Sequence, residues 1–537
     1  MRTGASPAAI SQQVWHDASV RLPHARNYIL ATLTAALLAL SAFVLADLDS
    51  VTAGAQPSVP TVSASVGSSP SGQPLASGFT GVSLEYNALH VYTGRDPRAV
   101  NPVLIGLIRN LASGQRPVLR IGGNSADYTW WPIRGATPPG NVHYSLTEGW
   151  LRTTKALASA LNARMIMGVN LAGGRPAVAA AEGRALLGGI GRRYIQALEI
   201  GNEPDVYGIF PWYRDRRGRV FFARGHNYNL NQFIRQFSRW RAALQQAPVA
   251  GPAFAELTWL NGLGTFIKAE RGLKVLTLHR YPLRACLQDP NAPGYPTIPA
   301  LLADSSSSGI AQAVAPYVAP VHAAGLPFRI GEMNSASCSG KPGVSDTFAS
   351  ALWVLDTLFN LANVGVDGVN IHSLPGAAYE LFTFTHTSSG WQAFVHPEYY
   401  GMLLFGQAFP PGARPLPVTV SPSGPVKVWA TRTPDLQTRV VVINKDPSSS
   451  YQVQLQVAGI SGPAQLERLQ APSASATNGV TLGGQTFGDQ TTTGTLPGPP
   501  QTEAVTPVLG TYTVTVPPAS AALLTPSNGS GGVGPGG

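Results

Sequence analysis

Short apolar runs alternate with longer amphipathic stretches between about residues 79 and 410. Runs of three to seven mostly apolar residues predict strands that are buried on both faces, as strands of parallel sheets are. The predicted strands lie at 82–86, 118–121, 165–169, 194–200, 248–253, 273–278, 328–330 and 368–371. The pattern therefore indicates an α/β fold built on a parallel sheet.

Helical periodicity fills several of the intervals between these strands. The predicted helices lie at 102–111, 151–161, 228–246, 310–324 and 347–363. The chain has eight predicted strands in βα alternation, and eight is the number that closes a (β/α)8 TIM barrel. An open doubly wound sheet is the alternative, but neither a GxGxxG motif nor a P-loop follows any predicted strand.

The pattern changes after about residue 410, where helical periodicity ends. Short β-prone runs at 418–420, 426–429, 440–443, 451–457 and 510–516 are separated by Pro, Gly and Ser. This spacing predicts an antiparallel β-sandwich. We expect a catalytic barrel over 78–410, a sandwich over 411–526 and a disordered Gly-rich tail over 527–537.

The N-terminal region has the pattern of an export signal. Arg21, His24 and Arg26 precede an apolar run at 28–46, and the small residues at 53–55 fit a cleavage site. The run is also close to the length that spans a bilayer, so residues 1–55 are either a signal peptide or a membrane anchor. Both readings predict a secreted protein or one held on the outer face of the membrane. Residues 56–77 read as a flexible linker that contributes at most one strand of the sandwich.

Composition and charge narrow the possible functional classes further. The net charge is +10 although charged residues make up only 12%, so the excess reflects few acids rather than basic blocks. We find no nucleic-acid-binding motif and expect no nucleic-acid partner. Cys286 and Cys338 are the two cysteines of the chain, and in an exported protein they favour a disulfide over two free buried thiols.

Two glutamates stand where a barrel builds its active site, at the carboxyl ends of strands. Glu203 follows the fourth predicted strand and Glu332 follows the seventh, each after a glycine and in a motif that contains an asparagine. Burying a carboxylate is costly unless it has a partner. Each glutamate alone could be the partner of an arginine, but as a pair they match the two carboxylates that glycoside hydrolysis needs.

The motifs around them resemble those of a known family. The segment LEIGNEPD at 198–205 is similar to the acid/base motif of the retaining (β/α)8 glycosidases, and IGEMNS at 330–335 to their nucleophile motif. With LRIGGNS at 119–125, LHRYP at 278–282 and GVSDTFASALW at 343–353, the chain resembles glycoside hydrolase family 79, the β-glucuronidase and heparanase-like family. The resemblance covers roughly residues 78 to 525.

The resemblance implies a retaining hydrolase of β-glycosidic bonds, with Glu203 as general acid/base and Glu332 as nucleophile. Retention requires the two carboxyl groups to lie roughly 5–5.5 Å apart and to form a covalent glycosyl-enzyme intermediate. Asn202 would bind the sugar 2-hydroxyl, and Tyr281 would hold Glu332 ionised. This chemistry requires neither a metal nor an organic cofactor.

The remaining candidates are less specific. Glu85 and Asn124 would bind ring hydroxyls, while His279 would order Tyr281 or Glu332, or serve only as a core histidine. Trp130 and its neighbour Trp131 would stack on a sugar or simply cap the barrel. His372 and Glu380, near the eighth strand, are weaker candidates.

One departure from the family concerns the substrate. In the glucuronidases of the family, a Tyr and a nearby Gly shortly after the nucleophile help hold the substrate carboxylate, but the corresponding stretch at 335–341 has no Tyr. Lys341, serine hydroxyls or backbone N–H groups are possible replacements. We expect a β-glucuronide or related glycan as substrate; a neutral-sugar β-glycosidase is the nearest rival, and a non-catalytic carbohydrate-binding protein a more distant one.

Overall fold

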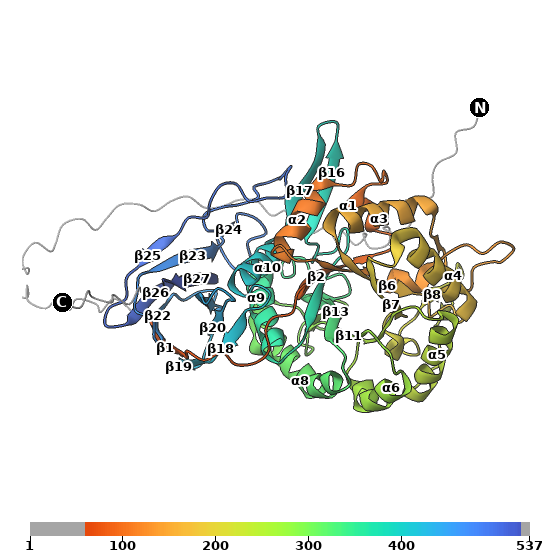
Figure 1. Ribbon diagram of the computed structural model, residues 1–537, viewed down its shortest axis with the longest axis horizontal. Coiled ribbons are helices and arrows are strands. Elements are labelled where there is room, and N and C mark those ends of the chain that lie inside the picture. The colour runs from red at the N-terminus through yellow and green to blue at the C-terminus, as the bar shows by residue number, and fades with distance from the viewer. Residues whose placement is uncertain (1–58, 528–537) are drawn as a thin grey trace, which may run out of the picture. The chain divides into compact units, whose positions relative to one another are not determined.

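The computed structural model describes residues 59–527 (Figure 1). Eight parallel strands close into a barrel in the order β10-β11-β13-β15-β2-β3-β6-β7. The strands are β2 (Thr80–Glu85), β3 (Val118–Gly122), β6 (Arg164–Val169), β7 (Ile195–Ile200), β10 (Val249–Phe254), β11 (Val275–Arg280), β13 (Phe328–Met333) and β15 (Gly368–Ser373). The predicted fold class is confirmed.

Helices surround this barrel, and Figure 1 shows α5, α6 and α8 on its outside. The main helices are α2 (Pro102–Ala112), α3 (Glu148–Leu161), α4 (Pro176–Leu186), α5 (Leu230–Ala243), α6 (Leu263–Ala269), α8 (Ser308–Ala323), α9 (Phe348–Asn363) and α10 (Pro397–Ala408). Helix α5 begins with a capping box, in which Asn229 and Gln232 bond each other's backbone N–H groups. The sequence analysis missed α10, because ten of its twelve residues are buried and no polar face marks its period.

Strand β13 differs from its prediction in a way that matters for the site. The strand was expected to end at Ile330, but it continues through Met333, so Glu332 lies within it. Its register against β11 shifts, with Leu278 opposite Ile330 but His279 opposite Glu332. The extra residue, Gly331, therefore places Glu332 level with His279 at the carboxyl end of the barrel.

The C-terminal domain contains two sheets that face a common apolar core. One has the order β19-β1-β22-β26 and the other β18-β20-β21-β27-β23-β24, with β25 also paired to β23. The strands are β1 (Thr61–Val66), β18 (Arg414–Leu416), β19 (Val418–Ser421), β20 (Val426–Arg432), β21 (Thr438–Asn444), β22 (Tyr451–Val457), β23 (Ala464–Gln470), β24 (Thr481–Leu482), β25 (Glu503–Val505), β26 (Thr511–Val516) and β27 (Ser520–Pro526). Strands β23 and β27 were not predicted.

A buried ion cluster joins this domain to the barrel. Lys445 is 5% exposed, and its ammonium lies 2.9 Å from Asp356 Oδ2 and 3.1 Å from Asp304 Oδ1. Lys445 also donates to Ser307 Oγ, and Trp429 Nε1 donates to Asp356 Oδ1. We call these five residues the Lys445 cluster.

The predictions for 1–58 and 528–537 lie outside the described residues. None of the helices within residues 59–527 combines the length and the apolarity that crossing a bilayer requires.

Candidate active site

Glu203 and Glu332 meet at the carboxyl end of the barrel. One carboxylate oxygen of each lies within 4.8 Å of the other and of a ring nitrogen of His279. The Glu203 side chain is 23% exposed, whereas that of Glu332 is 9% exposed. Glu203 lines a cavity of about 570 Å³, together with Asn124, Asn202 and Tyr281. The two carboxyl groups are therefore close together but differ in their access to solvent.

Glu332 is held in its ionised form. Its Oε2 accepts a 2.6 Å hydrogen bond from Arg120 Nη1, and its Oε1 accepts a 2.8 Å hydrogen bond from Tyr281 Oη. Burial alone would raise the pKa of Glu332. The positive charges of His372, His279 and Arg120 outweigh burial and hold that pKa well below its usual value. A carboxylate that stays ionised is suited to attack an electrophilic carbon.

Glu203 occupies a strained backbone position. Its φ is +53° and its ψ +52°, a left-handed conformation that residues other than glycine rarely adopt, and Pro204 begins a 3₁₀ turn directly after it. The Glu203 amide donates to the Ala253 carbonyl at 3.0 Å, which fixes the turn to β10. His279 Nδ1 lies 3.1 Å from Glu203 Oε1.

His279 contacts a different partner from the ones expected. The prediction was that it orders Tyr281 or Glu332, but its hydrogen bond is to Glu203. Burial and Arg120 lower the pKa of His279, while Glu332 and Glu203 raise it, with a net rise above the usual value. The Glu203 carboxylate is thus one of the two acidic groups that favour the protonated imidazole of His279.

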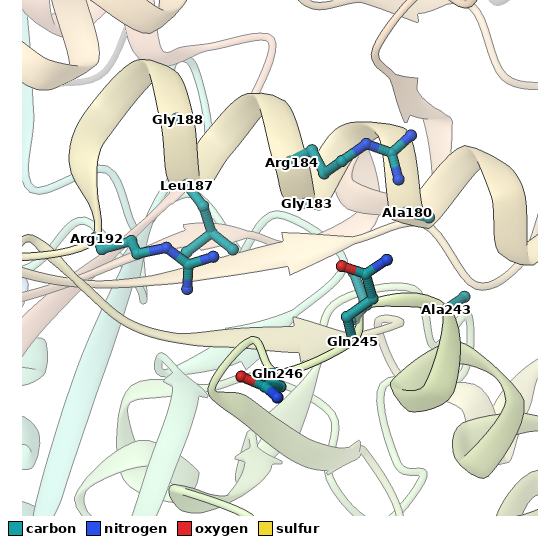
Figure 2. A pocket seen from close by; sticks show the side chains of 10 residues that line it. Ala180, Gly183, Arg184, Leu187, Gly188, Arg192, Ala243, Gln245 and Gln246 are labelled. Carbon is teal, nitrogen blue, oxygen red and sulfur yellow. The ribbon is translucent and has the colours of Figure 1, made fainter.

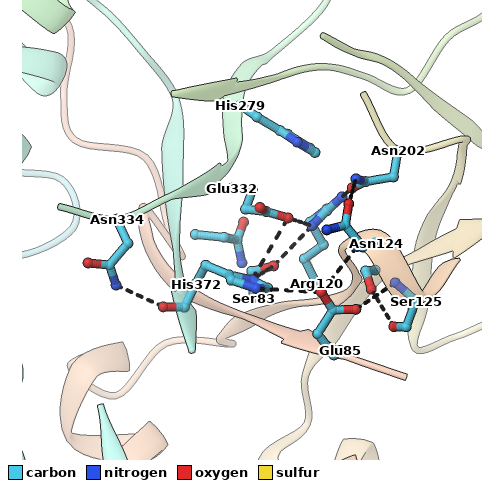
Figure 3. Close-up of polar contacts among 12 residues, drawn as sticks. Ser83, Glu85, Arg120, Asn124, Ser125, Asn202, His279, Glu332, Asn334 and His372 are labelled. Carbon is cyan, nitrogen blue, oxygen red and sulfur yellow. Dashed lines mark hydrogen bonds and ion pairs between the residues drawn. The ribbon is translucent and has the colours of Figure 1, made fainter. Parts of the chain in front are cut away.

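Arg120, which the sequence analysis did not single out, is the centre of the buried polar network (Figure 3). It is fully buried, and its Nε donates to Glu199 Oε2 at 2.6 Å. Its other nitrogens donate to Glu332, to Ser83 Oγ and to Asn202 Oδ1. We call these five residues the Arg120 cluster. An arginine inside the otherwise apolar run of β3 was the signal that could have identified it.

Glu85 and Asn124 lie beside this network (Figure 3). Glu85 accepts hydrogen bonds from the Asn124 and Ser125 amides at 3.1 and 2.8 Å, and burial raises its pKa. Gly123, at φ +66°, permits this approach, since a Cβ there would lie 2.2 Å from Glu85 Oε1. Asn124 Oδ1 accepts from Asn202 Nδ2 at 3.1 Å, so Glu85, Asn124 and Asn202 form one polar wall.

Of the weaker candidates, His372 belongs to the site and Glu380 does not. His372 lies 3.7 Å from Glu85 Oε1 and 3.8 Å from Glu332 Oε2. Glu380 accepts hydrogen bonds from Tyr92, Thr383 and the Gly376 amide, and it is not among the residues that line the cavity.

The prediction that Trp130 could stack on a sugar is corrected by the structure, in which the ring is buried. Its ring is 6% exposed and packs with Val142, Val178 and Trp212, while its Nε1 donates to Ser145 Oγ. The aromatic residue of this group that lines the cavity is Trp212. Sequence alone could not make this distinction, because it depends on packing between distant segments.

The predicted disulfide between Cys286 and Cys338 is confirmed. It joins the loop after β11 to the loop after β13, and both cysteines line the cavity. The bridge therefore fixes two loops that shape the site.

A second hollow, of about 470 Å³, lies between α4 and the end of α5 (Figure 2). Arg184, Arg192, Gln245 and Gln246 line it, and it contains no carboxylate. Within residues 59–527, the group of His and acidic side chains with metal-ligand spacing is Glu203, His279 and Glu332 themselves.

Comparisons with known proteins agree with this geometry. Residues 428–523 match the glycosyl hydrolase family 79 C-terminal beta domain. A beta-glucuronidase from Neurospora crassa is 23% identical over 444 residues, which cover 72% of this chain and 76% of the relative.

Solved structures share the fold. A 4-O-alpha-L-rhamnosyl-beta-D-glucuronidase from Fusarium oxysporum 12S has a TM-score of 0.69 at 21% identity, covering 86% of this chain and all of that one. A family 51 arabinofuranosidase from Xanthomonas axonopodis pv. citri has a TM-score of 0.61 at 15% identity, covering 87% of this chain and all of that one. The fold, the paired carboxylates and these relatives define the protein as a glycoside hydrolase that acts on a carbohydrate substrate. Its C-terminal domain is the β domain of glycoside hydrolase family 79.

Proposed function

We propose that the protein is a retaining β-glucuronidase in which Glu332 is the nucleophile and Glu203 the general acid/base. The observation that carries this proposal is the approach of their carboxylate oxygens to within 4.8 Å across one site. Retaining glycosidases keep their carboxyl groups about 5–5.5 Å apart, whereas inverting enzymes need roughly 6.5–9.5 Å to admit a water molecule. The depressed pKa of Glu332 and the greater exposure of Glu203, whose Oε1 lies 3.1 Å from His279 Nδ1, support the division of roles.

The reaction proceeds in two displacements. Glu332 attacks the anomeric carbon while Glu203 gives its proton to the leaving oxygen, so the glycosidic bond breaks as the glycosyl–Glu332 ester forms. Glu203, now ionised, removes a proton from water as that water attacks the anomeric carbon and releases Glu332. The Tyr281 hydroxyl donates to Glu332 Oε1 in the free enzyme, and so stabilises the carboxylate before it attacks and after the second step releases it.

Glucuronide specificity is the finer part of the proposal. The Neurospora crassa relative is named a beta-glucuronidase, which supports an acidic sugar. Lys341 is held by Tyr295, with its Nζ donating to Tyr295 Oη at 2.9 Å and lying 5.0 Å from the ring centre. Ser337 and Cys338 line the cavity instead, so their hydroxyl and backbone groups are the better candidates for binding the substrate carboxylate.

Export is also a proposal. The basic residues before the apolar run at 28–46 and the small residues at 53–55 support secretion or attachment to the outer face of the membrane. The disulfide favours the same oxidising environment.

The decisive experiment is covalent trapping. A cyclophellitol-type inhibitor of glucuronidase configuration, followed by peptide mapping, should label Glu332, and Glu332→Gln should prevent labelling. Label on any other residue would overturn the assignment of the nucleophile. A panel of 4-nitrophenyl glycosides tests the sugar: we expect the highest kcat/KM for the β-glucuronide, and a higher value for the β-glucoside or β-xyloside would establish the neutral-sugar rival.

A further inference from the structure

We propose, resting on the proposed function, that the cavity beyond Glu203 is a preformed subsite for a flat, apolar aglycone. The general acid must touch the leaving oxygen, so the leaving group extends into the space that Glu203 borders. The apolar residues that line this cavity include Val206, Phe210, Pro211, Trp212 and Leu287.

The loop that follows Glu203 exposes large apolar side chains. Phe210 is 53% exposed and its neighbour Ile209 is 63% exposed, in the loop that follows Glu203 by a few residues. Val220, across the same loop, is 37% exposed. Exposed apolar groups that gather beside a cavity mark a binding surface more often than single exposed residues do.

The loop that carries Phe210 is held in place by its own contacts. Strands β8 (Tyr213–Arg214) and β9 (Val220–Phe221) pair, and the Tyr213 and Phe221 rings stack with centroids 4.6 Å apart. The Trp212 amide donates to the Phe221 carbonyl, and His226 Nδ1 lies 2.7 Å from the Gly208 carbonyl. A wall ordered before binding loses little conformational entropy when a ligand packs on it.

The two arginines that line the cavity differ in their partners. Arg284 Nη2 lies 2.6 Å from Glu256 Oε1. Arg280 Nη1 donates to the neutral Ala255 carbonyl at 2.9 Å, and its Nε has no hydrogen-bond partner within residues 59–527. The arginines at 214, 216, 217 and 219 are not among the residues that line the cavity. The apolar side chains in the lining, rather than its charges, favour a flat, uncharged ring system.

The test compares aglycones on one sugar. Phe210→Ala should lower the ratio of kcat/KM for 2-naphthyl β-D-glucuronide to that for methyl β-D-glucuronide by roughly tenfold, the scale of a lost aromatic contact. Because the ratio is compared between enzymes, the different leaving-group chemistry of the two substrates cancels. Val508→Ala is the control: it removes an exposed apolar side chain of the C-terminal domain that does not line the cavity, and should leave the ratio unchanged.

A binding measurement tests the aglycone subsite independently of turnover. Calorimetry with the non-hydrolysable 2-naphthyl 1-thio-β-D-glucuronide and 1-thio-β-D-glucoside should show weaker binding to Phe210→Ala than to the unaltered enzyme for whichever sugar binds. Preference for the glucoside, with the same loss in Phe210→Ala, would overturn the glucuronide assignment and support the aglycone subsite. Equal ratios and affinities in Phe210→Ala and the unaltered enzyme would overturn the subsite alone.

Discussion

The protein buries two cations among carboxylates, one in the barrel and one where the barrel meets the C-terminal domain. Arg120 is fully buried and contacts Glu199 and Glu332, while Lys445 is 5% exposed and contacts Asp304 and Asp356. Both clusters satisfy the rule that buried charges are paired. They differ in whether their carboxylate oxygens can still accept a contact from another molecule.

Asp356 is fully engaged by protein donors. Its Oδ2 accepts from Lys445 and Ser307, and its Oδ1 accepts from Trp429 and Asn360. Glu332, in contrast, accepts one side-chain hydrogen bond on each oxygen, from Arg120 and Tyr281. A carboxylate oxygen has about two lone-pair sites, so Glu332 retains capacity for a reacting carbon while Asp356 does not. Unused acceptor capacity, rather than burial or charge, separates the catalytic cluster from the structural one.

Glu332→Gln gives the largest effect that this comparison predicts. It removes the nucleophile but keeps the shape of the side chain, so kcat should fall by roughly 10⁴-fold or more. The matched change in the other cluster, Asp356→Asn, should leave the kcat of the folded enzyme within about twofold, because Asp356 contacts no substrate. Steady-state kinetics on an aryl glucuronide measures both. A comparable loss in Asp356→Asn would contradict the division between the clusters.

Lys445→Met is the corresponding test of stability. It leaves Asp356 buried without its cation, and breaking a buried ion pair from one side costs about 3–5 kcal/mol. Thermal unfolding should therefore show a clear loss of stability, while the folded enzyme keeps its kcat/KM. Lys427→Met is the control, since Lys427 contacts the more exposed Asp304 and should cost about 1 kcal/mol or less. Equal losses of stability in the two variants would show that the burial of Lys445 adds nothing to the strength of its ion pairs.

The comparison also explains which parts of the molecule the sequence could predict. The eight barrel strands were found because each is a short apolar run buried on both faces, as in Arg164–Val169. Helix α10 and strand β27 were missed because nearly every residue in them is buried, so no polar positions marked a period. The extension of β13 to Met333 depends on pairing with β11 and β15, which local sequence does not contain.

For the site, motif residues were predictable and long-range partners were not. Glu203 and Glu332 each lie in a recognisable motif at a strand end, and the structure brings them together. Arg120 lies in the LRIGGNS motif, but its role depends on contacts with Glu199 and Glu332, which are 79 and 212 positions further along the chain. His279 was named as a candidate, yet its contact with Glu203 rather than Tyr281 is a matter of side-chain direction.

Asp205 is a buried carboxylate for which the described residues provide no ion-pair partner, so it contrasts with Asp356 and Glu332. It accepts hydrogen bonds from the Ala255 and Glu256 amides, and burial raises its pKa to about 7. A pKa that is higher in the folded state than its usual value of 3.8 gives stability that is fully present below about pH 3.8. That stability is lost as the pH rises through about 7, by up to about 4 kcal/mol.

Asp205→Asn removes this titration. The melting temperature of the variant, minus that of the unaltered enzyme, should therefore increase between pH 4 and pH 7 and level off above it. A difference for Asp205→Asn that stays constant with pH would mean that its carboxyl is ionised in the folded protein throughout.

Glu199→Gln has the smallest expected effect and separates positioning from catalysis within the Arg120 cluster. Glu199 contacts no substrate in the proposed reaction; its Oε2 accepts from Arg120 Nε at 2.6 Å and shares the arginine's charge with Glu332. Without the Glu199 charge, Arg120 interacts more strongly with Glu332, which lowers the pKa of that carboxylate and makes it a weaker nucleophile. Formation of the glycosyl-enzyme should slow by roughly tenfold, about 1.4 kcal/mol, while its hydrolysis should become no slower because a less basic carboxylate leaves more readily. Pre-steady-state kinetics on a dinitrophenyl glucuronide resolves the two steps: slowing of both would mean that the substitution has displaced Arg120, and slowing of neither would remove Glu199 from the account of how Glu332 is tuned.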